Sequence, residues 1–347
     1  MKASFYTESI LYWVAKRLCW LAQRLPPSLN AQIGVLVGTG FYYLLPRRCA
    51  VARGNLRAAF GNAHSPEDYD QIIRSLFQNL GTTLLEIGAI PSMDKNYVDR
   101  FIAPAPGSQE RLDKALSKKK GVIFLASHFG NWEISTVVAP RFGYPMLVLA
   151  REQGWPKLNG LLTRYREMNG CRVVTKGFPI RELIRGLEQG KIVGILADQD
   201  GGKHGVLAPF LGRLASTAPG AVALSLETGA PLIPVFIIRR YGTAHTIVLE
   251  EPIQMPQSGS KETRVQAGIA AYLSVLERYV RRYPSQWLWL HRRWKSTPER
   301  RLLLFSDGKP GHSAQIEALA QRIGMAWEVR MKEDRRFQGR SDLKEKR

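Results

Sequence analysis

Short runs of apolar, often β-branched residues recur through the middle of the chain, and segments with helical spacing lie between them. The runs are GVIFLAS, PMLVLAR, CRVVTK, KIVGILAD and PLIPVFII, which begin at residues 121, 145, 171, 191 and 231. Runs of this length predict β-strands. The segments at 132–142, 157–170, 180–190 and 220–229 predict helices, and the last three end in glycine, as helix C-caps do. This alternation predicts the α/β class, a layered and largely parallel sheet with flanking helices.

Helical patterns also flank the alternating region. Residues 47–92 read as helical and basic, with a new helix starting at Ser65-Pro66. After the last run, residues 245–253 predict one more strand, and residues 261–283 have the period of a long helix.

The N-terminal segment is amphipathic and basic. Between Ile10 and Leu25, apolar residues recur at helical spacing, and Lys16, Arg17 and Arg24 interrupt them. A helix of this kind suits an anionic membrane surface. The uncharged segment that follows, 25–46, has the length to span a bilayer but is only mildly apolar. A buried helical hairpin is the alternative, but the pattern favours a retained membrane attachment, since no signal-peptide cleavage site follows a compact apolar core.

The C-terminal tail has a pattern of its own. Residues 302–324 predict a strand, a glycine-bearing loop and a helix, which is how a new α/β domain opens. One strand and one helix cannot bury a core, so we expect this tail either to dock on the main domain or to be loosely ordered. The loop DGKPGH is a far weaker phosphate-binding signal than a full P-loop.

Charge changes the range of partners to consider. The 347 residues carry 50 Lys and Arg against 29 Asp and Glu, a net charge of +21, so the surface favours polyanions such as acidic lipid, acidic protein or nucleic acid. Hydrophobic residues make up 45% of the chain, which argues against wholesale disorder. The three cysteines are far apart, which disfavours a disulfide framework or a zinc site and fits a reducing compartment.

A candidate catalytic pair follows the first of the middle strands, in the segment SHFGNWE. His128 lies where that strand should end, and reactive groups of open α/β sheets gather at the carboxyl ends of strands. Gly130 permits a turn there, so His128 and Glu133 can converge and hydrogen-bond. Such a pair offers general-base catalysis, with the carboxylate fixing the tautomer of the imidazole. A structural His–acid pair is the alternative that spacing alone leaves open.

Other chemistries lack their motifs. There is no GxSxG nucleophile elbow, no HExxH zinc motif and no GxGxxG that follows a strand and opens a helix. We therefore expect no metal and no cofactor, and a nucleophile that comes from the substrate of a group transfer.

Three motifs in order resemble one known family. HFGNWE, the later segment from ADQDGG to PLIPV, and the terminal WLWLHRRWK are similar to the bacterial lipid A late acyltransferases, the lauroyl and myristoyl transferases, from the N-terminal helix to about residue 298. The resemblance implies a glycerolipid-acyltransferase-like α/β layer. It also divides the chain into membrane-associated helices (1–46), an acyltransferase domain (47–300) and an appended tail (301–347). The tail resembles the start of ELM-like proteins.

The resemblance also implies a reaction and its partners. An acyl chain passes from an acyl carrier protein thioester, or from acyl-coenzyme A, to a hydroxyl of a lipid A precursor. His128 and Glu133 match the catalytic His-x4-acid motif of the family, with His128 as base and Glu133 orienting it. The N-terminal helix implies attachment at the cytoplasmic face of the inner membrane. A different glycolipid or a lipid amine is the alternative acceptor.

Three arginines and an asparagine are candidate substrate-binding residues. Arg151 and Arg164 match arginines of the family, and Arg166 is close enough to exchange roles with Arg164. Their planar guanidinium groups suit lipid phosphates, although Arg166 can instead belong to a solvated basic helix face. Asn131 lies in the catalytic motif itself and is expected to contact the substrate.

Two acids end the strand that begins at residue 191. Asp198 and Asp200 are expected at the same sheet edge as His128, as structural or substrate-contacting groups, because nothing nearby supplies the oxygen ligands of a dedicated cation site. Residues 291–294, His-Arg-Arg-Trp, suit a membrane interface or a nucleic acid backbone.

A nucleic-acid-binding protein is the main alternative of another class. The net charge permits it, but the arginines are spread along the chain and no helix-turn-helix, RRM or zinc module is visible. An acidic carrier protein and an anionic lipid account for the charge without nucleic acid. A further alternative is a fusion whose tail carries a scaffold or glycosyltransferase role.

Overall fold

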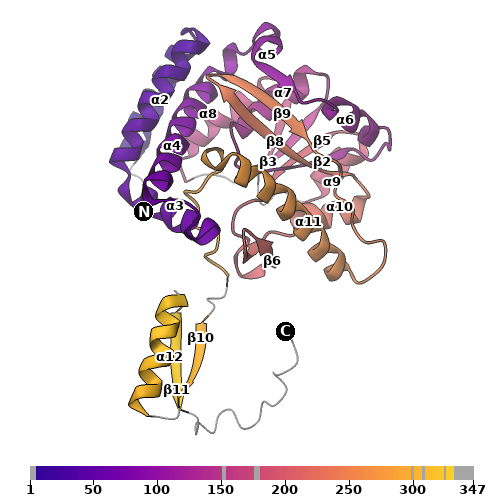
Figure 1. Ribbon diagram of the computed structural model, residues 1–347. Helices are drawn as coiled ribbons and strands as arrows, with labels where there is room; N and C mark the ends of the chain where they lie inside the picture. The colour runs from indigo at the N-terminus through magenta and orange to yellow at the C-terminus, as the bar shows by residue number, and fades with distance from the viewer. Residues whose placement is uncertain are drawn as a thin grey trace. The chain divides into compact units, whose positions relative to one another are not determined.

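The computed structural model describes residues 5–150, 154–175, 180–297, 301–306, 309–323 and 326–331. They fall into two compact units, Met1–Ser296 and Thr297–Arg347, each drawn in Figure 1. Arg151 lies outside the described residues.

A seven-stranded sheet forms the centre of the first unit, in the order β1-β9-β8-β2-β5-β3-β4. All neighbouring strands are parallel except β8 and β9, which are antiparallel. The predicted, largely parallel sheet is therefore confirmed. The strands are β1 (Ile102–Pro104), β2 (Val122–Ala126), β3 (Met146–Ala150), β4 (Cys171–Thr175), β5 (Ile192–Leu196), β8 (Leu232–Tyr241) and β9 (Ala244–Leu249).

Helices cover both faces of the sheet, as Figure 1 shows. They are α5 (Lys95–Phe101), α6 (Ser108–Leu116), α7 (Ser135–Arg141), α8 (Pro156–Glu167), α9 (Arg181–Glu188), α10 (Gly220–Thr228) and α11 (Lys261–Arg282). Strand β2 is apolar on both sides, since Phe124 packs with α6 and α7 and Leu125 packs with α9, α10 and α11. Burial on both faces is what a central parallel strand requires.

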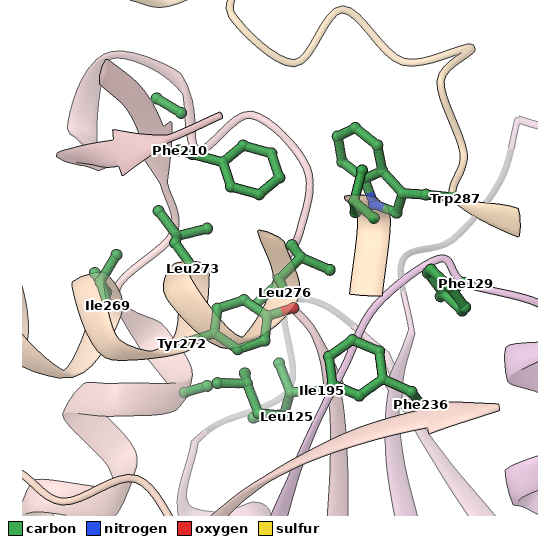
Figure 2. Packing of buried hydrophobic residues seen from close by; sticks show 14 of the residues in the cluster. Leu125, Phe129, Ile195, Phe210, Phe236, Ile269, Tyr272, Leu273, Leu276 and Trp287 are labelled. Carbon is green, nitrogen blue, oxygen red and sulfur yellow. The ribbon is translucent and has the colours of Figure 1, made fainter. Parts of the chain in front are cut away.

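The larger core lies between the sheet and α11. Figure 2 shows Tyr272 of α11 beside Leu125 of β2 and Ile195 of β5, and Leu273 and Leu276 of the same helix belong to the same cluster. The same cluster holds Trp287, which is 2% exposed. The predicted glycine caps are also confirmed, because Gly170, Gly190 and Gly229 all have left-handed φ angles, of 92°, 76° and 70°.

An N-terminal group of helices packs beside this layer. It consists of α1 (Phe5–Ala22), α2 (Pro27–Leu44), α3 (Pro46–Phe60) and α4 (Pro66–Ala89). The predicted start of α4 is confirmed, since the hydroxyl of Ser65 accepts the N–H of Asp68 in a capping box. Helices α2 and α4 approach very closely through glycines: a Cβ built on Gly81 would lie 2.1 Å from the carbonyl oxygen of Gly34.

The first two helices turn apolar side chains outward. Exposed residues of α1 include Ile10, Trp13, Leu18 and Trp20, and those of α2 and its end include Leu36, Tyr43, Leu44 and Leu45. The hairpin packs on α4 with its other side, so it is neither fully buried nor free of the domain. Within the described residues, no helix has the combination of length and apolarity needed to cross a bilayer.

Smaller elements complete the first unit. A hairpin of β6 (Val206–Phe210) and β7 (Arg213–Thr217), which the sequence pattern did not predict, packs against α11. In the part of this unit that the structure describes, the short 3-10 helices are η1 (Ile90–Ser92), η2 (Trp132–Ile134), η3 (Gly202–His204) and η4 (Pro284–Gln286).

The second unit contains β10 (Arg301–Ser306), α12 (Pro310–Ile323) and β11 (Ala326–Met331), with its two strands parallel. The predicted strand and helix are confirmed, and β11 is an additional strand. The resemblance to ELM-like proteins stays a prediction.

Candidate active site

His128 lies at the carboxyl end of β2, beside the end of the neighbouring strand β5. Its backbone N–H donates to Oδ2 of Asp198 over 2.9 Å, and its Nδ1 lies 2.8 Å from Oδ1 of the same carboxylate. Strands β2 and β5 are adjacent and parallel, so their ends bring the two residues together although they are 70 positions apart in the chain. Gly130 makes the turn that was predicted after His128, with a φ of 57°.

Asp198 is buried, and its carboxylate makes three hydrogen bonds. Trp287 donates its indole N–H to Oδ2 over 2.8 Å, in addition to the two contacts with His128. Burial opposes ionisation, but the charge and hydrogen bonds of His128 prevail and lower the pKa of Asp198. For His128, burial acts to lower the pKa, and the attraction of Asp198 outweighs it, so the pKa is raised above its ordinary value.

This pairing sets the proton-accepting atom of His128. With the carboxylate held at Nδ1, the neutral imidazole carries its proton there and keeps Nε2 as an acceptor. The ring of Trp132 packs edge-on against the imidazole, with centroids 5.0 Å apart. The amide nitrogen of Gln199 lies 3.4 Å from Nε2, too far for a strong hydrogen bond.

Glu133 does not hydrogen-bond to His128, and that part of the prediction is wrong. The 3-10 turn η2 directs Glu133 toward α8, where Arg166 donates from Nε to Oε2 (2.7 Å) and from Nη2 to Oε1 (2.6 Å). The indole of Trp132 donates to the same carboxylate over 3.1 Å. The carboxylate that contacts Nδ1 of His128 is that of Asp198, two residues beyond the end of β5, and not that of the His-x4-acid motif.

The structure separates the two arginines of α8. Arg166 is largely buried in its fork-to-fork contact with Glu133 and lines the same cavity as His128, which excludes a solvated helix face. Arg164 is exposed and lines a separate groove between α8 and α1, beside Tyr12 and Trp13.

Asn131 holds the turn between His128 and Glu133. It is 1% exposed. Its Oδ1 accepts the backbone N–H of Glu133 over 3.2 Å, and its Nδ2 donates to Glu86 over 2.7 Å. Its side chain is thus engaged within the protein, and the contact with substrate stays a prediction.

Behind Asn131 lies a buried ionic network that the sequence pattern did not reveal. Both oxygens of Glu86 on α4 accept from Arg239 on β8 over 2.7 Å, and Nε2 of His245 on β9 lies 3.0 Å from Oε1. Burial opposes ionisation of Glu86, but His245 and Arg239 overcome it and lower its pKa to about 2. Helix α4 and the sheet are thus joined through Asn131 to the turn that follows His128.

Asp200 and Arg293 hold neighbouring loop and strand segments together through hydrogen bonds. Asp200 accepts the backbone N–H groups of Gly202 (2.9 Å) and Ser296 (3.0 Å), which favours its structural interpretation. The prediction that residues 291–294 form a membrane or nucleic acid interface is wrong for Arg293. That side chain is 1% exposed and donates to the carbonyl of Ser216 and the hydroxyl of Thr217.

A cavity of about 850 Å³ opens beside His128. Its walls are mostly apolar, and its polar lining residues include Ser127, Glu133, Arg166 and Gln199. On the α7 side of the sheet the apolar walls include Phe124, Met146, Val148, Gly194 and Val235, and on the other side they include Leu183, Ile195 and Leu224. A half-buried histidine that lines a mostly apolar cavity fits a protein that binds a hydrocarbon-bearing ligand.

Comparisons with known proteins identify the family of the chain. The sequence profile of the bacterial lipid A biosynthesis acyltransferases matches residues 2–296. The chain therefore belongs to that family, and it is an acyltransferase.

Relatives are known from several bacteria. The lipid A biosynthesis palmitoleoyltransferase of Escherichia coli (strain K12) is 27% identical over 293 residues, which cover 83% of this chain and 92% of that protein. The lipid A biosynthesis lauroyltransferase of the same strain is 26% identical over 298 residues, with the same coverage. A phosphatidylinositol mannoside acyltransferase of Mycobacterium tuberculosis (strain CDC 1551 / Oshkosh) is 24% identical over 169 residues, 48% of this chain and 54% of that protein.

Proposed function

We propose that this acyltransferase moves a fatty acyl chain from an acyl carrier protein thioester to a hydroxyl of a lipid A precursor. The observation that carries the proposal is the pairing of Nδ1 of His128 with Asp198 beside the apolar cavity, which leaves Nε2, 3.4 Å from the amide nitrogen of Gln199, as the proton acceptor. Two of the relatives are named for lipid A biosynthesis and match nearly their whole length.

This geometry supports the following reaction. Nε2 of His128 removes the proton of the acceptor hydroxyl while its oxygen attacks the thioester carbonyl carbon. The tetrahedral intermediate then collapses, the carbon–sulfur bond breaks, and His128 returns the proton to the leaving thiolate. Asp198 keeps Nδ1–H in place and stabilises the imidazolium that forms.

The negative oxygen of the intermediate needs hydrogen-bond donors. Arg166 and Gln199 both line the cavity beside His128. In Arg166 the nitrogens Nε and Nη2 already bind Glu133, so the salt bridge holds the guanidinium in one orientation. Glu133 therefore acts through Arg166, and a preorganised donor of this kind is worth about 3 kcal/mol of barrier.

The N-terminal helices supply the attachment to a membrane in this proposal. Their exposed apolar side chains include Trp13 and Trp20, against which Lys16 and Arg24 pack as cations. An amphipathic basic helix lies in the headgroup region with its apolar face among the acyl chains. We place the enzyme at the cytoplasmic face of the inner membrane, where acyl carrier protein supplies the donor.

A mass measurement of lipid A precursors tests the proposal. Membranes containing the protein are incubated with labelled acyl carrier protein thioester, for the wild type, His128→Ala and the control His64→Ala, which changes an exposed histidine. The wild type and the control should add one acyl chain, and His128→Ala should add almost none. Near wild-type turnover by His128→Ala would remove the catalytic assignment.

A second acceptor class is supported by one relative. The mycobacterial phosphatidylinositol mannoside acyltransferase is similar to this chain, so a different glycolipid is the alternative acceptor. Acylation of a phosphatidylinositol mannoside, but not of lipid A precursors, in the same assay would favour it.

A further inference from the structure

The cavity beside His128 extends along the sheet, on the side covered by α7. Gly194 on β5 lies between Phe124 on β2 and Val148 on β3, and all three residues line the cavity. Phe124 precedes His128 by four positions, which corresponds to about 13 Å along an extended strand. A straight acyl chain whose carbonyl lies at His128 therefore reaches the level of Gly194.

Gly194 leaves a gap in the middle of this wall, and one side chain covers it. A Cβ at position 194 would lie 2.6 Å from the terminal methyl carbon of Met146 and 3.6 Å from a methyl carbon of Val148. Met146 is 3% exposed, begins β3 and also lines the cavity. Its thioether thus lies over the glycine, at the end of the strand that is farther from the catalytic edge.

The backbone does not require glycine at this position. Gly194 is absent from the glycines with positive φ angles, so its conformation is open to other residues. Glycine is needed here for room, because a larger residue at position 194 would collide with the Met146 side chain that lies against the sheet. Methionine is unbranched and flexible, which suits an adjustable end wall.

We propose that Gly194 and Met146 form the end wall of the donor acyl-chain site and set the length of chain that is transferred. The inference rests on the proposed function and concerns the fatty acyl chain of the donor thioester. A methyl group at position 194 pushes the Met146 thioether into the cavity and shortens it. Removal of the Met146 side chain deepens it.

A competition among donors tests the end wall. Equal amounts of decanoyl, dodecanoyl, tetradecanoyl and hexadecanoyl carrier protein thioesters are offered together, and product masses give the ratio of chains transferred. The variants are Gly194→Ala, Met146→Ala and the control Gly54→Ala, which adds a methyl to an exposed helix position with open space around it.

Opposite shifts are expected from the two variants. Gly194→Ala should move the product toward shorter chains and Met146→Ala toward longer ones, each by about tenfold in the ratio of adjacent chain lengths. Gly54→Ala should keep the wild-type ratio. Unchanged ratios in both cavity variants, with turnover retained, would overturn the proposal.

A binding measurement separates this inference from the proposed reaction. Binding of radiolabelled decanoate, dodecanoate and tetradecanoate to the full chain needs no acceptor and no turnover. If the wild type transfers no chain, the proposed function fails, and the same opposite shifts in fatty acid binding would still support the end wall. If a cavity variant does not fold, Met146→Leu replaces it. The same preference for chain length in Met146→Leu and in the wild type would count against the proposal.

Discussion

At the scale of single residues, the site depends on which carboxylate meets His128. The motif spacing predicts that Glu133 hydrogen-bonds to His128. In the structure Asp198 makes that contact, and Glu133 pairs with Arg166 instead. Sequence spacing describes neighbours along one segment, whereas the contact with Asp198 depends on strand β5 lying beside β2. The alternation of strands and helices predicts that strands align but leaves their order open, so the identity of the partner could not be predicted.

The tautomer of His128 gives the first prediction at this scale. Asp198→Asn keeps the shape of the side chain but removes its negative charge and one of the two oxygens that contact His128. The proton of the imidazole is then no longer held at Nδ1, so Nε2 is no longer fixed as the proton acceptor. We expect kcat to fall by about a thousandfold or more, with a small change in KM. Steady-state kinetics over a range of acceptor concentrations measure both, and a loss of less than tenfold would assign Asp198 to structure alone.

The pH dependence of the reaction follows from the same pair. His128 must be neutral to act as a base, and Asp198 raises its pKa above the ordinary value of 6.5. The value of kcat/KM should therefore rise with pH, with a midpoint above 6.5, because the inactive imidazolium persists to higher pH. In Asp198→Asn the residual activity should show its midpoint at lower pH, and an identical midpoint in both proteins would contradict this assignment.

At the scale of elements, the strands β2, β3, β4, β5, β8 and β9 and the helices α7 to α11 could be predicted, but β1, α5, α6 and the hairpin β6–β7 could not. Its two-residue turn consists of Leu211 and Gly212, both with positive φ angles, of 51° and 75°. Asparagine or aspartate before glycine is the usual signal for such a turn, and leucine gives none. The turn is instead fixed by tertiary contacts, since Leu211 is 1% exposed and its N–H donates to Glu277 of α11.

The ionic network between α4, β8 and β9 gives a prediction about stability. Glu86→Gln leaves Arg239 buried without its counter-charge, so the free energy of unfolding at neutral pH should fall by about 3–5 kcal/mol. The pKa of Glu86 is lowered from 4.5 to about 2, so its contribution is present above pH 4.5 and is lost as pH falls toward 2. The wild type and the variant should therefore differ most near neutrality and converge in acid.

Denaturant unfolding at several pH values tests the network. The matched control is Glu227→Gln, whose side chain is exposed and makes a long contact of 3.5 Å with Lys261, so its stability should stay close to wild type. If the free energies of unfolding of the wild type and Glu86→Gln differ by the same amount from neutral pH to acid, the assignment is contradicted.

At the scale of the whole molecule, the exposed face of α1 and α2 gives the prediction. Leu18 on α1 is 58% exposed, and Leu319 on α12 of the second unit is 57% exposed. Because α1 is proposed to lie in the membrane surface, Leu18→Glu should weaken binding to vesicles that contain anionic lipid, and Leu319→Glu should leave binding unchanged. Co-sedimentation with such vesicles at constant ionic strength measures both variants, and equal losses in the two would argue against a membrane role specific to α1.

The same outward-facing helices have a consequence for how the enzyme meets its acceptor. An enzyme that lies on the lipid surface encounters a lipid substrate by lateral diffusion, in two dimensions. Its rate then depends on the mole fraction of acceptor in the bilayer and not on the bulk concentration. Dilution of the acceptor with inert phospholipid, at a fixed amount of acceptor per volume, should slow the reaction, while dilution of the whole suspension should change it little as long as the enzyme stays bound.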